Sequence, residues 1–135
     1  MQSQLGHLQI NIKRENLAFY KELLAFLEWQ VMYSTDDFIG AADKNGASVW
    51  FMGFANDAQN DYDGVGMNHL AFGVAQQRDV DAAVAYLQGK GVPLLFETPR
   101  HRPDFAQGPD QTYYQVMFES PDRILLEIVY IGVKE

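Results

Sequence analysis

The chain has 135 residues, of which 47% are hydrophobic, enough for one globular domain with a packed core. Eighteen acidic against ten basic residues give a formal net charge of −8, which argues against nucleic acid or an anionic membrane as a partner. Because the chain has no cysteine, disulfides and thiol nucleophiles are excluded, and any metal ion must be held by nitrogen and oxygen.

The N-terminal residues do not resemble a targeting segment. They lack the basic stretch followed by an apolar stretch that is typical of a secretory signal. No apolar run in the chain is long enough to span a bilayer. We therefore expect a cytoplasmic protein whose single domain covers residues 1–135.

The first part of the chain predicts a strand, a helix and three more strands. In residues 6–12 apolar side chains alternate with polar ones, and His7 falls on the polar side of the strand. Residues 17–27 carry apolar side chains at helical spacing, and Asn16 can cap this helix. The strands expected after the helix are 29–33, 38–42 and 47–54.

Residues 55–65 form a polar segment rich in aspartate and glycine, which is typical of a connector. A calcium-binding loop would need a regular spacing of ligands and a terminal glutamate, and this segment has neither. We therefore expect a solvated acidic linker between two structural units.

The second part of the chain repeats the element order of the first. Residues 66–74 alternate in the same way, and His69 takes the place that His7 has in the first strand. A helix is expected at 80–88, with Asp79 as its cap. The strands expected after it are 94–97, 113–119 and 124–131. Such self-similarity predicts one structural unit used twice.

A long segment, residues 98–111, separates two of these strands and contains His101 between two arginines. Its length favours a functional loop over a plain connection. We expect Arg100 or Arg102 to contact an acidic group of a substrate, because arginine binds carboxylate and phosphate in a fork geometry. The alternative is that both arginines pair with surface carboxylates such as Asp104.

Glu127 is the one charged residue in a predicted strand that is otherwise apolar on both faces. A carboxylate buried there without a partner is costly or becomes protonated. Its partner could be Lys or Arg, a hydrogen-bond network, or a metal ion. The metal ion gains weight because His7 and His69 already face the same way from equivalent strands.

The repeat, the two strand histidines and the ending with Ser120-Pro121-Asp122-Arg123 before Glu127 resemble the vicinal oxygen chelate superfamily. This superfamily includes glyoxalase I, extradiol dioxygenases, fosfomycin-modifying enzymes and bleomycin resistance proteins. The resemblance covers essentially the whole chain. It implies an α+β fold of two β-α-β-β-β modules, about 5–54 and about 66–133, whose mixed sheets curve around a metal-containing cup.

The same resemblance implies one divalent metal ion, Fe, Mn, Zn or Ni, held by His7, His69 and Glu127. It implies a metal-dependent enzyme acting on a small oxygenated molecule, and lyase, isomerase, dioxygenase and thiol transferase chemistry all stay open. Glyoxalase I has a further glutamate where this chain has Trp50. The dioxygenases and fosfomycin enzymes have a tyrosine where it has Met117.

Other side chains are expected to surround the metal. Tyr113 lies on the same strand face as Met117 and is a candidate catalytic residue, as is His101. An apolar, polarizable lining suits an aromatic or otherwise hydrophobic small molecule, and the alternative is packing across a module or dimer interface. The residues expected to contact the substrate are Trp50, Met52, Met67, Arg100, Arg102 and Met117.

The resemblance also implies a homodimer, because paired modules present a self-complementary surface. The alternative function is a non-catalytic small-molecule or drug-binding protein of the bleomycin-resistance type. Binders of that type lack the metal triad, so the triad is the feature that separates the two functions.

Overall fold

A computed structural model describes all residues, 1–135. The chain divides into two compact units, Met1–Gln59 and Asn60–Glu135. The division falls inside the segment 55–65 that the sequence predicts as a linker. Each unit is described by itself.

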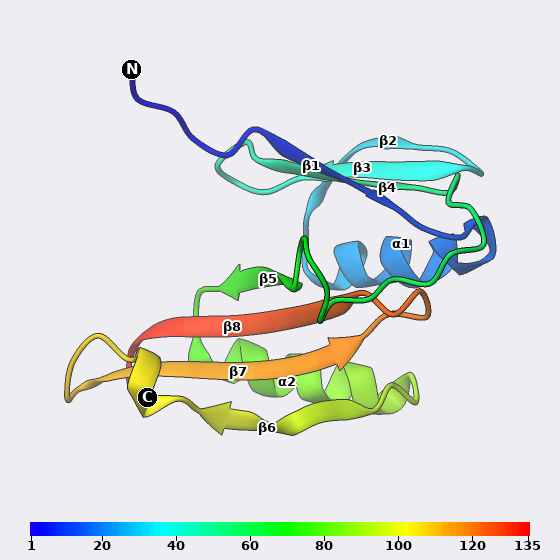
Figure 1. Cartoon of the computed structure of the whole chain (residues 1–135). Helices are drawn as coiled ribbons and strands as arrows, with labels where there is room; N and C mark the ends of the chain where they lie inside the picture. The colour runs from blue at the N-terminus through cyan, green and yellow to red at the C-terminus, as the bar shows by residue number, and fades with distance from the viewer. The chain divides into compact units, whose positions relative to one another are not determined.

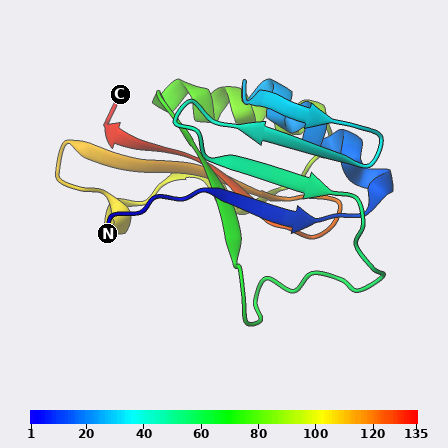
Figure 2. The same cartoon turned by 90° about the horizontal axis from the view of Figure 1, so that it is seen from above.

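The first unit contains one helix and one four-stranded sheet. The sheet order is β1-β4-β3-β2, in which β1 runs parallel to β4 and the other neighbours are antiparallel. Figure 2 shows β1 and β4 side by side, with their arrows in the same direction. The elements are β1 (His7–Asn11), a 3-10 turn (Arg14–Asn16), α1 (Leu17–Phe26), β2 (Gln30–Ser34), β3 (Phe38–Ala42) and β4 (Ser48–Met52).

The core of the first unit lies between α1 and one face of this sheet. Tyr20 of α1 is fully buried, and its ring stacks on that of Phe51 with the ring centres 4.3 Å apart. Leu23 and Leu24 follow at helical spacing and are also buried. The apolar stripe predicted for the helix is thus the one that packs on the sheet.

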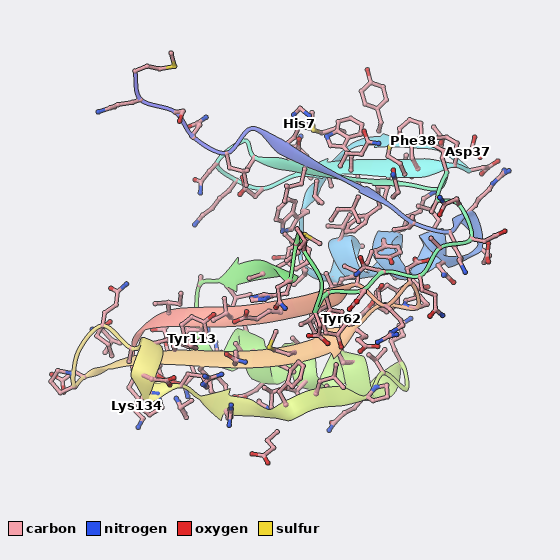
Figure 3. All side chains as sticks on the ribbon, viewed as in Figure 1. His7, Asp37, Phe38, Tyr62, Tyr113 and Lys134 are labelled. Atoms are coloured by element: carbon pink, nitrogen blue, oxygen red, sulfur yellow. The ribbon has the colours of Figure 1, made fainter.

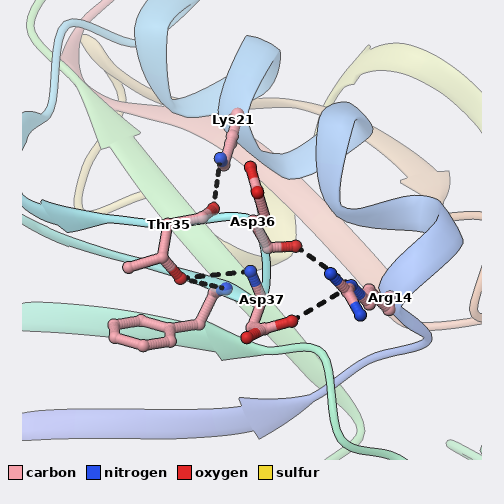
Figure 4. A network of polar contacts seen from close by, with 6 residues as sticks. Arg14, Lys21, Thr35, Asp36 and Asp37 are labelled. Carbon is pink, nitrogen blue, oxygen red and sulfur yellow. Dashed lines mark hydrogen bonds and ion pairs between the residues drawn. The ribbon is translucent and has the colours of Figure 1, made fainter.

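A polar network holds the turn between β2 and β3 (Figure 4). The Thr35 hydroxyl accepts hydrogen bonds from the backbone N–H groups of Asp37 and Phe38, at 3.1 and 3.2 Å. Lys21 Nζ donates to the Thr35 carbonyl at 2.6 Å, and Arg14 Nε lies 3.0 Å from Asp37 Oδ1. Both basic residues come from the helical segment, so the network ties the hairpin to the helix.

The second unit repeats this arrangement, with sheet order β5-β8-β7-β6 and β5 parallel to β8 (Figure 1). The remaining neighbours are antiparallel. The elements are β5 (His69–Val74), α2 (Gln77–Gly89), β6 (Leu94–His101), a 3-10 turn (Pro103–Phe105), β7 (Gln111–Glu119) and β8 (Leu125–Val133).

Helix α2 covers one face of the second sheet. Val80, Ala83 and Leu87 are fully buried on its inner side. The Tyr114 hydroxyl of β7 donates to Asp81 Oδ1 of α2 at 2.7 Å, which identifies the face of β7 that the helix covers. Successive strand residues alternate in direction, so the neighbours of Tyr114 point away from α2.

The fold class expected from the sequence is confirmed. The protein is α+β, and two β-α-β-β-β modules each form an open mixed sheet with one helix on it. Neither helix of the structure could cross a membrane.

Several predicted bounds differ from the structure, and two of the differences bear on the site. Helix α2 begins at Gln77 rather than Val80, and Asp79 is its third residue, where Oδ2 accepts the Gln76 backbone N–H at 3.0 Å. Asp79 thus acts at the third helical position of a capping box whose N-cap is Gln76. Glutamine is not one of the small polar residues that usually cap a helix. In addition, β6 continues to His101, so Arg100 and His101 belong to a strand and the loop is shorter than 98–111.

Candidate functional site

The candidate site lies on the face of the second sheet that points away from α2. Glu127 of β8 is the register partner of Ala71 on β5 and of Met117 on β7. Side chains at partnered positions point to the same side of a sheet, and so do side chains two residues along a strand. We call this side the Glu127 face; it carries His69, Ala71, Tyr113, Gln115, Met117 and Glu127.

Glu127 is buried, with an exposed fraction of 1%, and both of its carboxylate oxygens have close neighbours. The Tyr113 hydroxyl donates to Oε1 at 2.6 Å. His69 Nε2 lies 2.9 Å from Oε2. Tyr113 and His69 are therefore the partners that a buried carboxylate at this position requires.

The orientation of the His69 ring is set by Asn68. The Asn68 amide Nδ2 donates to the Tyr62 carbonyl at 2.9 Å, so its Oδ1 is the atom that faces His69 Nδ1, at 2.8 Å. Nδ1 therefore carries the proton and donates to Asn68. Nε2, the other ring nitrogen, is the atom that faces Glu127.

A ring nitrogen and a carboxylate oxygen that face each other at this distance need a proton or a cation between them. Two adjacent ligands of a six-coordinate ion, with bonds of about 2.1 Å, lie about 3.0 Å apart. The 2.9 Å between His69 Nε2 and Glu127 Oε2 fits that separation. A metal-binding histidine usually donates its other ring N–H to an oxygen, as His69 does to Asn68.

The structure contains no group of three or more His, Asp or Glu side chains that could hold a metal ion. His69 and Glu127 are the pair that the second unit supplies. His7, the third ligand expected from the sequence, lies on β1 in the first unit.

Tyr113 is a hydrogen-bond donor with a raised pKa. Burial is the largest cause, and the hydrogen bond to Glu127 and its negative charge act in the same direction. The phenol therefore stays protonated at neutral pH. Phe105 packs edge-on against its ring, with the ring centres 5.4 Å apart, and the Arg102 guanidinium lies 4.5 Å from the Phe105 centre. Figure 3 labels Tyr113 on β7.

His7 is exposed and shares a sheet face with two residues that the sequence predicts to bind substrate. Along the parallel pair of β1 and β4, His7 is the partner of Ser48, and Trp50 and Met52 follow at alternate positions. All four side chains therefore point away from α1. Figure 3 labels His7 on β1 and Phe38 on β3, both in the first unit.

Trp50 lies in an aromatic group on that face. Its ring centre is 6.1 Å from that of Tyr33 and 6.3 Å from that of Phe38, and its Nε1 donates to Ser48 Oγ at 3.0 Å. Gly40 leaves room for the indole, because a Cβ at this position would lie 2.3 Å from the ring. The absence of a side chain at position 40 is what allows Trp50 to lie flat on β3.

His101 lies on the opposite side of the second sheet from Glu127. Its Nδ1 is 2.5 Å from Thr112 Oγ1, and its ring centre is 4.5 Å from that of Tyr114 on the α2 side. Burial, with a smaller contribution from Asp81, raises the pKa of Tyr114 to about 12. His101 therefore lies on the α2 side of the sheet, whereas Tyr113, the other catalytic candidate, lies on the Glu127 face.

The remaining predicted residues are distributed over several environments. Arg100 is the register partner of Gln115 and so lies on the Glu127 face. Arg102 Nη2 pairs with Asp104 Oδ2 at 3.2 Å, the surface pairing that the sequence leaves open as an alternative. Met67 precedes β5 and is 41% exposed, whereas Met117 is 8% exposed.

The site also contains residues that sequence reasoning missed. Asn68 orients His69, and Gln115 lies between Tyr113 and Met117 on the same face of β7. The alternation of strand residues could have identified Gln115, because it shares its direction with Met117. No sequence signal indicates that Asn68 would bond to the ring beside it.

The comparison with known proteins agrees with this fold. The sequence model of the Glyoxalase/Bleomycin resistance protein/Dioxygenase superfamily matches residues 4–128. The chain therefore belongs to that superfamily.

The chain is similar to proteins of known structure. A Bacillus halodurans protein provisionally named a glyoxalase is 30% identical, with a TM-score of 0.77 and 96% of each chain covered. The fosfomycin resistance protein FosX of Listeria monocytogenes, solved with Mn(II) and sulfate, is 23% identical, with a TM-score of 0.66 over 95% of this chain and 90% of that one. This second likeness concerns the fold.

One curated relative has no assigned activity. The uncharacterized protein YqjT of Bacillus subtilis is 42% identical over 65 residues, which are 48% of this chain and 47% of that protein. The match thus spans about half the length of the curated relative.

Proposed function

We propose that the protein is a divalent-metal-dependent enzyme that acts on a small oxygenated molecule. The proposed ligands are His7, His69 and Glu127. The observation that carries the proposal is the His69–Glu127 pair, in which Nε2 lies 2.9 Å from Oε2 while Nδ1 is held by Asn68. Superfamily membership supports the same assignment, and FosX, a structural relative, was solved with Mn(II).

The ion, whether Fe, Mn, Zn or Ni, would supply Lewis-acid stabilisation of the negative charge that develops on substrate oxygens during the reaction. The chain's own residues prepare the site for it. Tyr113 engages one oxygen of Glu127, so the carboxylate turns its other oxygen toward His69. Isomerase, lyase, dioxygenase and thiol transferase reactions all use this charge stabilisation. The proposal covers this shared step and does not choose among the four reactions.

The side chain next to Glu127 on the sheet favours a substrate with an apolar part. Met117 is the register partner of Glu127 and presents a polarizable thioether on the same face. In the first unit, Trp50 and Met52 share a face with His7. A small molecule with an aromatic or aliphatic body and two adjacent oxygens would match these side chains.

The proposal includes a cytoplasmic homodimer. The edge strand β2 supports self-association, because Val31, Met32 and Tyr33 are 50%, 51% and 63% exposed on it. Exposed apolar edge strands are prone to pair with another chain. Sedimentation at micromolar concentration should show a dimer, and Val31→Lys should shift the protein toward the monomer. If the parent protein is a monomer, the proposed dimer is wrong, but the proposed metal site is unaffected.

The metal proposal is tested by Mn(II) binding, measured from the loss of the free-ion signal in electron paramagnetic resonance. The parent protein should bind one ion per chain. His7→Ala, His69→Ala and Glu127→Gln should each weaken binding about tenfold or more. His101→Ala is the matched control, because the third histidine lies on the α2 side, and it should bind like the parent.

The metal-binding measurement also separates the metal-dependent enzyme from a non-catalytic binder. If the parent binds Mn(II), Zn(II), Ni(II) and Fe(II) no better than the His69→Ala variant does, the metal proposal is wrong. The alternative of a non-catalytic small-molecule binder of the bleomycin-resistance type would then be the better description.

A further inference from the structure

We propose that Arg100 and Gln115 form a subsite that binds a carboxylate group of the ligand on the Glu127 face. The proposal rests on the proposed function in one respect, namely that a small molecule occupies this face. It does not require that a metal ion is bound there.

The starting point is two buried nitrogen atoms without partners. Gln115 is 2% exposed, and its Nε2 has no hydrogen-bond partner. Arg100 Nε is likewise buried and unpartnered, although the Arg100 side chain as a whole is 40% exposed. Buried polar groups nearly always have a partner, so these two donors are available to an acceptor that enters the site.

These two donors come from neighbouring positions. Arg100 on β6 is the register partner of Gln115 on β7, and partnered side chains start about 5 Å apart on the same face. Gln115 in turn is the partner of Val129 on β8, two residues beyond Glu127. Gln115 is therefore offset from Glu127 by about 7 Å along the strands and about 5 Å across them, and Arg100 lies one strand farther away.

A bulge in β6 brings Arg100 to this position. Leu95 is the partner of Met117, and the next paired residue of β6, Arg100, is the partner of Gln115. The residues of β6 between Leu95 and Arg100 thus bulge out of the ladder. The Thr98 hydroxyl fills the gap in the ladder: it donates to the Leu95 carbonyl at 2.7 Å and accepts the Met117 N–H at 2.9 Å. Bulges commonly redirect a side chain next to a functional site.

The charges around the subsite favour an anionic acceptor. Arg100 Nη1 lies 3.8 Å from Glu97 Oε2, but Glu97 is 90% exposed, so this ion pair is weak and leaves the guanidinium free to bind a second anion. Gln115 adds neutral N–H donors and no competing charge. A planar carboxylate has two oxygens, so it can accept from the guanidinium and from the amide N–H groups at the same time.

The expected ligand is therefore a small organic acid. Its carboxylate would bind Arg100 and Gln115, and its second oxygenated group would lie beside Glu127, about 8 Å from Gln115. The sequence predicts an acidic substrate group from the arginines alone. The structure narrows the contact to Arg100 and adds Gln115, because Arg102 is already paired with Asp104.

The test uses the full chain, labelled with ¹⁵N and supplied with Zn(II), and follows the Arg100 Nε–H and Gln115 amide signals by nuclear magnetic resonance. Benzoate is the probe, and benzamide is its neutral counterpart of the same shape. Both signals should shift saturably with benzoate, and benzamide should bind at least about tenfold more weakly.

Variants locate the binding. Arg100→Lys keeps the charge but removes the Nε–H, and Gln115→Met keeps the size but removes the amide. Each should weaken benzoate binding about tenfold. Arg78→Lys, on α2, is the matched control and should bind like the parent. A thermal melt of each variant verifies folding.

The outcomes distinguish this proposal from the metal proposal. Glu127→Gln should lose Mn(II) affinity yet still show the benzoate shifts, which isolates the carboxylate subsite from the metal ligands. The proposal is overturned if benzoate moves neither signal in the parent protein. It is equally overturned if benzamide binds as well as benzoate, or if Arg78→Lys weakens binding as much as Arg100→Lys.

Discussion

The Tyr113 hydroxyl reaches Glu127 Oε1 at 2.6 Å, although the two residues are not register partners. Tyr113 is opposite Ile131, four residues beyond Glu127 on β8, so the phenol must lie along the sheet to make this bond. The length of the tyrosine side chain thus allows it to hold a buried carboxylate whose backbone is four residues away along the strand pair. This contact, together with the His69 ring, determines which oxygen of Glu127 is available.

Replacing Tyr113 by Phe should weaken the metal site. The variant keeps the ring against Phe105 but leaves the buried Glu127 Oε1 without its donor, which costs about 1–3 kcal/mol of unfolding free energy. Mn(II) affinity should fall about tenfold, because Glu127 loses the contact that orients it. Urea unfolding and Mn(II) titration measure the two effects.

Tyr114→Phe is the matched control for this change. It also removes a tyrosine hydroxyl bonded to a carboxylate, but Asp81 belongs to α2 and lies on the other side of the sheet. Mn(II) affinity should be unchanged in this variant. Equal losses in both variants would mean that Tyr113 acts on stability alone.

Stability should fall at alkaline pH. The pKa of Tyr114 in the folded protein is raised to about 12 from the ordinary value of 10.0, mainly by burial and then by Asp81, and the pKa of Tyr113 is raised in the same direction. A raised pKa means that the folded state holds the proton more tightly than the unfolded one. The stabilisation is thus complete below pH 10 and is lost as the pH rises from about 10 to about 12.

Urea unfolding at several alkaline pH values measures this loss. The decline in unfolding free energy should be shallower in Tyr114→Phe, because the phenol that titrates has been removed. A parent and a variant with the same decline between pH 10 and 12 would contradict the assignment to Tyr114.

Replacing Asn68 by Ala should weaken metal binding without unfolding the protein. Asn68 is exposed, so its loss costs little stability, but the His69 ring loses the acceptor for its Nδ1 proton. Mutation of such outer contacts typically lowers metal affinity about 10- to 100-fold. Asn60→Ala, which removes an exposed amide bonded to the Arg123 carbonyl, is the control. An unchanged Mn(II) affinity in Asn68→Ala would remove the orienting role.

Replacing Gly40 by Ala should destabilise the first unit. A Cβ at position 40 would lie 2.3 Å from the Trp50 ring, so the indole must leave its position on β3. The expected loss is about 1–3 kcal/mol of unfolding free energy, with a change in tryptophan fluorescence. Gly73→Ala, where nothing lies within 4 Å, should be nearly neutral. Similar melting temperatures for the two variants would contradict this account of Trp50.

Several features of the site follow from local patterns in the chain. Alternation along the strands predicts that His7 and His69 face away from the apolar side, and the register of β1 and β5 agrees with it. A lone glutamate in an apolar strand predicts that Glu127 is buried and needs a partner. The 1% exposure of Glu127 and its contacts with two side chains confirm both points.

Other features depend on pairing between distant segments. His101 was expected in a loop, but the strand β6 extends to it and turns its ring toward Tyr114. The bulge that brings Arg100 beside Gln115 is held by Thr98, which bonds across to β7. Neither the length of β6 nor its register can be obtained from β6 alone, because both are decided by hydrogen bonds to another strand.

The sequence by itself determined the repeated β-α-β-β-β order, the face of each strand histidine and the need of Glu127 for a partner. These depend on the two-residue period of strands and on the cost of burying charge, which are local properties. The tertiary structure alone decided that Tyr113 and His69 are those partners and that Gln115 lies beside Arg100. The reason is physical: strand pairing sets which side chains lie close together, and a shift of one residue would reverse every face.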